Sequence, residues 1–201
     1  MNIKHVLASI DKSTGGPARS VTALIESIIK VNKRVEVSLE TLSSNDPIIN
    51  FFSSQNGEIN FHKKKKTAYL QSLRNNILNH KPQILHGHGL WQMPVHQMAM
   101  LARKKKIPYI ITPRGMLEPW SLTQGKLKKQ IALKLFQYKD LVRANCIHAT
   151  APMEVDSIRK LGFTNPIAMI PNGISISDFP LTIPKKQKTP KKILFLSRIH
   201  V

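Results

Sequence analysis

Acidic residues are scarce in this sequence. Eleven Asp and Glu stand against thirty-one Lys and Arg, which gives the 201-residue chain a formal net charge of +20. Such a surplus implies attraction to polyanions or to anionic membrane surfaces, and it does not determine the fold. Aromatic residues are also few, at 6%, and no helix-turn-helix pattern accompanies the cations. The sequence therefore argues against nucleic acid as a partner.

Cysteine and long apolar runs are nearly absent as well. The one cysteine, Cys146, has no partner for a disulfide within the chain, which fits a reducing compartment. No run approaches the ~20 apolar residues that span a bilayer. The N-terminal segment also turns polar too soon for a secretory signal. We expect a cytoplasmic protein that is soluble or peripheral on the inner face of the membrane.

Short apolar runs alternate with segments of helical period, which is typical of βαβ units and a parallel sheet. Strands are predicted over residues 3–10, 34–42, 58–62, 84–87, 109–112, 146–150 and 167–170. Helices are predicted over 21–29, 69–79, 94–105, 126–144 and 153–161. The expected fold class is α/β, with a Rossmann-like doubly wound parallel sheet.

The C-terminal part of the sequence changes composition. Residues 180–192 are rich in proline and lysine and cannot build a core, which predicts an interdomain linker. Residues 193–201, ILFLSRIHV, have the pattern of a buried strand followed by a loop. We expect one domain over 1–179, a linker over 180–192, and the truncated first strand of a second lobe over 193–201.

Two glycine-containing segments follow predicted strands. Gly15 and Gly16 lie between the first strand and the first helix, where a helix N-terminus can receive an anion. A purely structural turn explains this pattern equally well. His86 and His88 come at the end of the fourth strand, and a spacing of two places both side chains on one face. Neutral polar contacts in a cleft are favoured over a metal site, because no nearby cysteine or carboxylate completes a ligand set.

A third segment, ITPRGMLEPWSL, follows the fifth strand. Arg114, Glu118 and Trp120 offer a planar cation, an acceptor and a flat apolar face, a set that suits a sugar or a phosphate. In the alternative interpretation, Arg114 pairs with Glu118 and Trp120 only packs.

Six motifs occur in an order and spacing that resemble the retaining GT-B glycosyltransferases of family 4. They are GGP, HGHGLW, TPRGMLEPW, IHATAPMEVDSIRKLG, IPNGI and ILFLSRIH. The TPRGMLEPW form is most similar to bacterial enzymes of lipopolysaccharide or capsule synthesis. The resemblance covers the whole chain and implies a nucleotide-sugar donor, a lipid-linked or oligosaccharide acceptor, and no metal or other cofactor.

The resemblance also implies roles for individual residues. Gly15, Gly16 and Arg198 correspond to groups that bind the donor diphosphate, and His88 corresponds to the catalytic histidine near the donor sugar. Arg114, Glu118 and Trp120 are assigned to acceptor binding. Ser175 replaces the aspartate that often follows the PNG segment. The donor lobe is expected to lie largely beyond Val201, present in trans or lost, so the isolated chain is expected to be inactive.

The clustered lysines allow a second hypothesis. Basic runs near Lys63, Lys104 and Lys128, together with the amphipathic helix predicted over 126–144, favour docking on an anionic leaflet. A solvated helix face remains the alternative for each run. The chain could then be a non-catalytic, membrane-associated binding module instead of an enzyme lobe.

Overall fold

The computed structural model describes residues 1–49, 57–64, 69–174 and 176. Its strands form one seven-stranded parallel sheet in the order β3-β2-β1-β4-β5-β6-β7. The strands are β1 Asn2–Leu7, β2 Glu36–Leu42, β3 Gly57–His62, β4 Ile84–His88, β5 Tyr109–Thr112, β6 Cys146–Ala149 and β7 Ile167–Met169. The predicted α/β fold and parallel sheet are confirmed. Arg198, the predicted linker and the predicted last strand lie outside the described residues.

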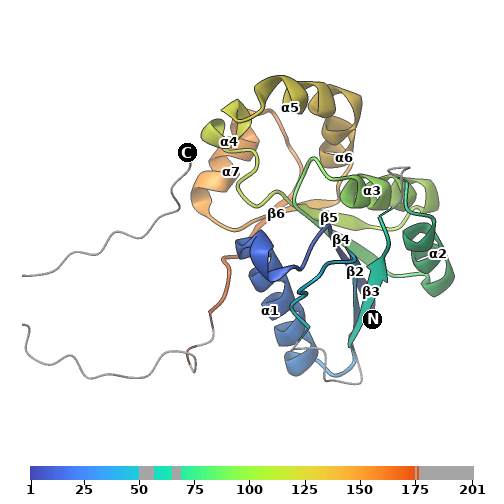
Figure 1. The fold of residues 1–201 in the computed structure, drawn as a ribbon. Helices are drawn as coiled ribbons and strands as arrows, with labels where there is room; N and C mark the ends of the chain where they lie inside the picture. Colours follow the sequence, from blue (N-terminus) through green and yellow to red (C-terminus); the bar gives the residue numbers. More distant parts are fainter. Residues whose placement is uncertain (50–56, 65–68, 175, 177–201) are drawn as a thin grey trace, which may run out of the picture.

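Helices cover both faces of this sheet (Figure 1). They are α1 Gly16–Val31, α2 Gln71–His80, α3 Met93–Lys105, α4 Pro119–Thr123, α5 Lys126–Ala132, α6 Tyr138–Val142 and α7 Pro152–Lys160. A 3₁₀ turn, η1 Lys12–Thr14, precedes α1, and a π-helical segment, η2 Leu133–Gln137, joins α5 to α6. The predicted helix over 126–144 is thus one continuous rod with a π turn in its middle. The short helix α4 was not predicted.

Two apolar clusters show which helix covers which face. Val6 belongs to the cluster under α2, α3, α6 and α7, whereas its neighbour Leu7 belongs to the cluster under α1. Adjacent strand residues point to opposite faces, so α1 covers one face of the sheet, and α2, α3, α6 and α7 cover the opposite face. The strand order explains this, since right-handed crossovers that run outward from β1 in opposite directions place their helices on opposite faces.

Candidate functional site

The carboxyl ends of the parallel strands carry the residues singled out in the sequence. Ligands of open α/β sheets bind at this edge. The strand order reverses between β1 and β4, and Gly15 follows β1 while His88 ends β4. Leu7 of β1 is paired with His88 of β4, so the carboxyl ends of these two strands lie at the same level. Gly15, His88 and the loop after β5 therefore meet at one end of the sheet.

A polar row crosses four strands on the α1 face: His5 of β1, His86 and His88 of β4, Thr112 of β5 and His148 of β6. All five side chains are buried. The rings of His86 and His88 are 4.1 Å apart, which confirms that the two share a face. His86 Nε2 lies 2.7 Å from Thr112 Oγ1, and His88 Nε2 lies 2.9 Å from His5 Nδ1. We refer to these five residues as the histidine row.

Burial keeps three histidines of the row, His5, His86 and His88, uncharged. It lowers the pKa of His5 to about 3, with smaller contributions from the charge of Arg114 and from His148. Burial likewise lowers the pKa of His86 and of His88 well below their usual value, and neighbouring histidines and Arg114 add to the effect. A charged imidazole loses its hydration when it is buried, so the neutral form dominates at physiological pH.

Arg114 connects the histidine row to the glycine loop. Its Nη2 donates to His88 Nδ1 at 3.3 Å, and its Nη1 donates at 2.9 Å both to Ser20 Oγ and to Asn172 Oδ1. Burial lowers the pKa of Arg114 to about 10, and the charge of Glu154 opposes that shift, so the guanidinium remains charged at neutral pH. Its backbone has φ 59°, a left-handed conformation that is rare for a residue with a side chain.

Glu154 of α7 holds the loop that carries Arg114. Its carboxylate accepts hydrogen bonds from the Gly115 N–H at 2.7 Å and from the Thr150 N–H at 2.7 Å. The Glu154 side chain is buried. These bonds stabilise the loop in the conformation that places the guanidinium of Arg114 over His88, because a strained backbone persists only where its surroundings fix it.

The glycine loop leaves a helix N-terminus open beside Arg114. Gly15 has φ 82° and ψ −140°, a conformation available almost only to glycine. Gly16 begins α1, which has no side-chain cap and no acidic residue in its first turn. Ser20 Oγ accepts from Arg114 and donates to the Gly16 carbonyl at 3.0 Å. Free N–H groups of α1 and the guanidinium thus lie at one place, an arrangement that attracts an anion.

The three predicted acceptor residues lie on the loop after β5 and on the helix that follows it. Glu118 accepts a hydrogen bond from Ser157 of α7 at 2.9 Å, so its carboxylate is directed toward that helix and not toward Arg114. Trp120 lies on α4 with 61% of its surface exposed. The alternative pairing of Arg114 with Glu118 is therefore not formed among the described residues. The binding roles of the three residues stay predictions.

His88 is completely buried, and both of its ring nitrogens are engaged by His5 and Arg114. Direct contact with a ligand would require Arg114 to leave Nδ1. The catalytic role assigned to His88 stays a prediction.

Three histidines of the row could also be considered as metal ligands. One nitrogen each of His5, His86 and His88 lies within 4.8 Å of the others. However, His5 and His88 are hydrogen-bonded to each other, and the Arg114 guanidinium is 3.3 Å from His88. Three imidazoles can bind zinc, but the fixed charge of Arg114 beside His88 would repel a divalent ion at this place. The expected absence of a metal stays a prediction.

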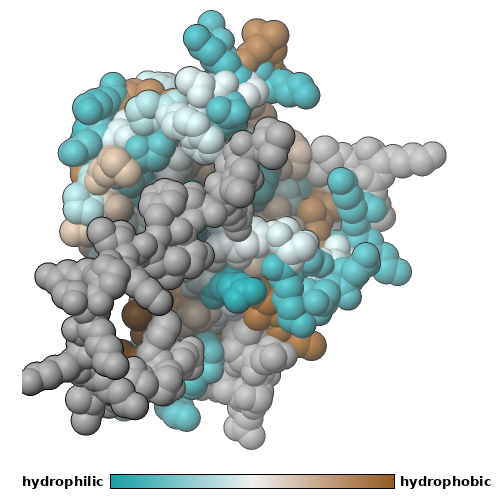
Figure 2. Space-filling view, turned by 60° about the vertical axis from the view of Figure 1, so that its left-hand side comes forward, coloured by the Kyte–Doolittle hydropathy of each residue, from teal (hydrophilic) through white to brown (hydrophobic). Residues whose placement is uncertain are grey.

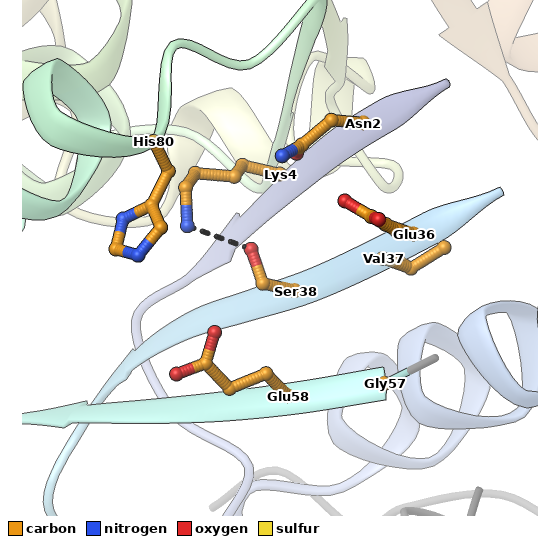
Figure 3. A pocket seen from close by; sticks show the side chains of 8 residues that line it. All are labelled: Asn2, Lys4, Glu36, Val37, Ser38, Gly57, Glu58 and His80. Carbon is orange, nitrogen blue, oxygen red and sulfur yellow. Dashed lines mark hydrogen bonds between the residues drawn. The ribbon is translucent and has the colours of Figure 1, made fainter. Parts of the chain in front are cut away.

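A separate pocket lies at the opposite, amino edge of the sheet. It has a volume of about 230 Å³ and is lined by Asn2, Lys4, Glu36, Val37, Ser38, Gly57, Glu58 and His80. Figure 3 shows Lys4 reaching from β1 to Ser38 on β2, with Glu58 on β3 below them. The pocket is remote from Arg114, since parallel strands place their amino and carboxyl ends at opposite edges.

Family comparison places the chain in a known group. The model of the glycosyl transferase 4-like domain matches residues 59–173, which is more than half of the sequence and includes both His88 and Arg114. The chain belongs to the glycosyl transferase 4-like family. A comparison with curated proteins found no match.

Solved structures support the same fold for this family member. Alr3699/HepE from Anabaena, solved with UDP-glucose, matches with a TM-score of 0.58 and 14% identity over 88% of this chain. MnaA from S. aureus, solved with UDP, matches with a TM-score of 0.56 and 14% identity over 84% of this chain. A sucrose-phosphate synthase from Thermosynechococcus elongatus matches with a TM-score of 0.54 and 15% identity over 86% of this chain and 90% of that one. This chain spans less than half of two of these proteins, 45% of the Anabaena chain and 44% of the S. aureus chain.

Proposed function

We propose that this chain forms the acceptor-side lobe of a retaining glycosyltransferase that uses a nucleotide sugar and a lipid-linked glycan acceptor. The reaction would belong to bacterial cell-surface polysaccharide synthesis, on the cytoplasmic face of the membrane. One observation carries the proposal: Arg114 and the open N-terminus of α1 meet beside Gly16. The family membership and the UDP-containing neighbours support the same substrate class.

This arrangement suits a diphosphate leaving group. A nucleotide sugar loses its diphosphate as negative charge develops on the phosphate oxygens, and fixed cations and N–H groups stabilise that charge. Arg114 would supply the cation from this lobe, a donor-side role that differs from the acceptor role predicted from the sequence. The N–H groups of Gly16 and the following turn would supply the hydrogen-bond donors. In a retaining reaction the leaving diphosphate would help to deprotonate the acceptor on the same face of the sugar, so positioning contributes most of the catalysis.

Ligand binding followed by NMR tests this proposal. We expect UDP-glucose or another nucleotide sugar to shift the amide signals of Gly15, Gly16 and Ser20 and the side-chain signal of Arg114. Arg114→Met should weaken binding about tenfold or more, because a hydrogen bond to a charged group contributes about 1.5–3 kcal/mol. Arg34→Met is the control, since Arg34 is exposed between α1 and β2. Shifts centred on the amino-edge pocket, or equal binding by Arg114→Met, would contradict the proposal.

An exposed apolar stripe favours a second property, docking on an anionic membrane. Leu127 and Leu135 are 71% and 76% exposed, and Ile131, Tyr138 and Val142 on the same face of α5, η2 and α6 are also exposed. Lysines flank the stripe at 126, 128, 129, 134 and 139, and residues 119–139 include no Asp or Glu. Hydrophobic side chains protrude between hydrophilic ones at the top of the molecule, where α5 lies (Figure 2). No helix in the described part of the chain is long and apolar enough to cross a bilayer.

Charge complementarity supports an anionic lipid surface as the occupant of this stripe. Each lysine near such a surface contributes about 1 kcal/mol, and apolar side chains of an amphipathic helix insert among the headgroups. A lipid-linked acceptor would then be presented to the lobe from the same surface. The same stripe would equally serve a non-catalytic binding module, so a sugar-transfer assay on the membrane-bound protein separates the two functions.

Vesicle sedimentation tests the docking surface. We expect binding to vesicles with anionic phosphatidylglycerol, weaker binding at high salt, and little binding to neutral phosphatidylcholine vesicles. Leu135→Glu should reduce binding about tenfold or more, because inserting a leucine contributes about 1.5–3 kcal/mol. Val31→Glu is the matched control: Val31 is 87% exposed at the end of α1, away from the stripe. Equal losses in the two variants, or self-association in place of vesicle binding, would contradict membrane docking.

A further inference from the structure

The hydrogen bonds of the histidine row determine where each proton lies. An arginine side chain offers only donors, so His88 Nδ1 must accept from Arg114 Nη2. The other nitrogen of a neutral imidazole carries the proton, and His88 Nε2–H therefore donates to His5 Nδ1 at 2.9 Å. His5 Nδ1 is thus an acceptor, and the proton of His5 lies on Nε2.

The other end of the row leads to the same kind of assignment. The carbonyl of Ile170 can only accept, so His148 Nε2–H donates to it at 2.9 Å. His148 Nδ1 then accepts from the Thr112 hydroxyl at 3.1 Å. Thr112 Oγ1 in turn accepts from His86 Nε2–H at 2.7 Å. All four imidazoles hold their proton on Nε2, because a guanidinium fixes one end of the row and a carbonyl fixes the other.

This arrangement leaves His5 with an unsatisfied hydrogen-bond donor. Its Nε2 is buried without a hydrogen-bond partner among the described residues, and an unsatisfied buried donor costs about 1–3 kcal/mol. The reversed bond, in which His5 Nδ1–H donates to His88 Nε2, would remove that unsatisfied donor. It would also place the proton of His88 on Nδ1, against the N–H of Arg114. The tautomer that leaves His5 Nε2–H unsatisfied is therefore the one that allows Arg114 to donate to His88.

We propose that His5 is a positioning residue, which holds Arg114 at the anion site by keeping His88 in its Nε2–H tautomer. His88 transmits this effect: its Nδ1 lone pair faces Arg114 only while His5 accepts the proton on the opposite side of the ring. Arg114 then keeps its Nη1 donors on Ser20 and Asn172. The consequence for ligand binding rests on the function proposed above, whereas the tautomer assignment does not.

Long-range ¹H–¹⁵N correlation spectra of the histidine rings test the assignment in the unmodified protein. The expected spectrum shows His5, His86, His88 and His148 all as Nε2–H tautomers at pH 7.5. An Nδ1–H tautomer for His88 would overturn the proposal without any variant. This result is independent of nucleotide binding, so a failure of the proposed function would be recognised separately.

Two substitutions of His5 separate its hydrogen bond from its bulk. His5→Asn places an amide oxygen near the position of Nδ1, so His88 should keep its tautomer and the protein should bind inorganic pyrophosphate as before. His5→Leu retains volume but offers no acceptor, so His88 should populate both tautomers and pyrophosphate affinity should fall about tenfold. His148→Leu removes another ring of the row and should leave the His88 tautomer unchanged. A single Nε2–H tautomer of His88 in folded His5→Leu, or its loss in both leucine variants, would overturn the proposal.

Discussion

Lowering the pH from 7 to 5 is expected to reduce the free energy of unfolding by roughly 5–6 kcal/mol. His5, His86 and His88 are buried and neutral in the folded protein, and burial lowers the pKa of each. In the unfolded chain their pKa values return to about 6.5. Below that pH the unfolded state binds more protons than the folded state, so the free energy of unfolding falls as the pH falls.

The size of this effect follows from linkage. Each such histidine removes about 1.4 kcal/mol per pH unit below pH 6.5, and for His5 this continues down to a pH of about 3. Three groups together remove about 4 kcal/mol per unit, which is a large part of the 5–15 kcal/mol typical of a folded domain. Urea unfolding at pH 7, 6 and 5 measures the slope.

A single substitution tests whether the histidine row causes this pH dependence of stability. In His86→Gln the amide nitrogen can still donate to Thr112, but the titrating group is gone, so the pH slope should fall by about a third. His80→Gln is the control, because His80 is exposed at the end of α2. A stability that stays constant between pH 7 and pH 5 would show that the three histidines His5, His86 and His88 are not held neutral.

The sequence predicted the sheet well, because its strands are buried and separated by clear helical or turn signals. It could not show what the stripe of residues 127–142 faces. Periodicity identifies an apolar side of a helix, whereas the exposure of that side within the described part of the chain is a tertiary property. Helix α4 was missed because five residues within a loop, PWSLT, are too few to establish a period.

The site was predicted only where a motif surrounds it. His86, His88 and Arg114 lie next to glycines at strand ends, and the structure brings them together. His5 and Thr112 were missed because only the strand register places them beside His86 and His88. Glu118 and Trp120 were grouped with Arg114 by their closeness in sequence, which does not determine side-chain direction in a loop.

Glu40→Gln is expected to destabilise the fold by about 3–5 kcal/mol. The carboxylate of Glu40 is completely buried on β2 and accepts from Lys4 at 2.8 Å, from His62 at 2.7 Å, and from Asn60 and Asn76 at 3.2 Å each. Burial alone would raise the pKa of Glu40, but the hydrogen bond from His62 and the charge of Lys4 outweigh it and lower that pKa. The carboxylate is therefore ionised at neutral pH.

The main cost of this substitution falls on Lys4. Its ammonium is 1% exposed beside the amino-edge pocket, and a glutamine would remove the carboxylate that pairs with it at 2.8 Å. Breaking one side of a buried pair costs about 3–5 kcal/mol, whereas replacing both charges is often much less costly. The double variant Lys4→Met with Glu40→Gln should hence be more stable than Glu40→Gln alone.

Asp46→Asn, which breaks the exposed pair with Lys12, is the control and should cost less than about 1 kcal/mol. If urea unfolding shows the double variant to be less stable than Glu40→Gln, the unpaired ammonium does not cause the loss of stability. The loss would then come from the hydrogen bonds through which Glu40 joins β1, β2, β3 and α2.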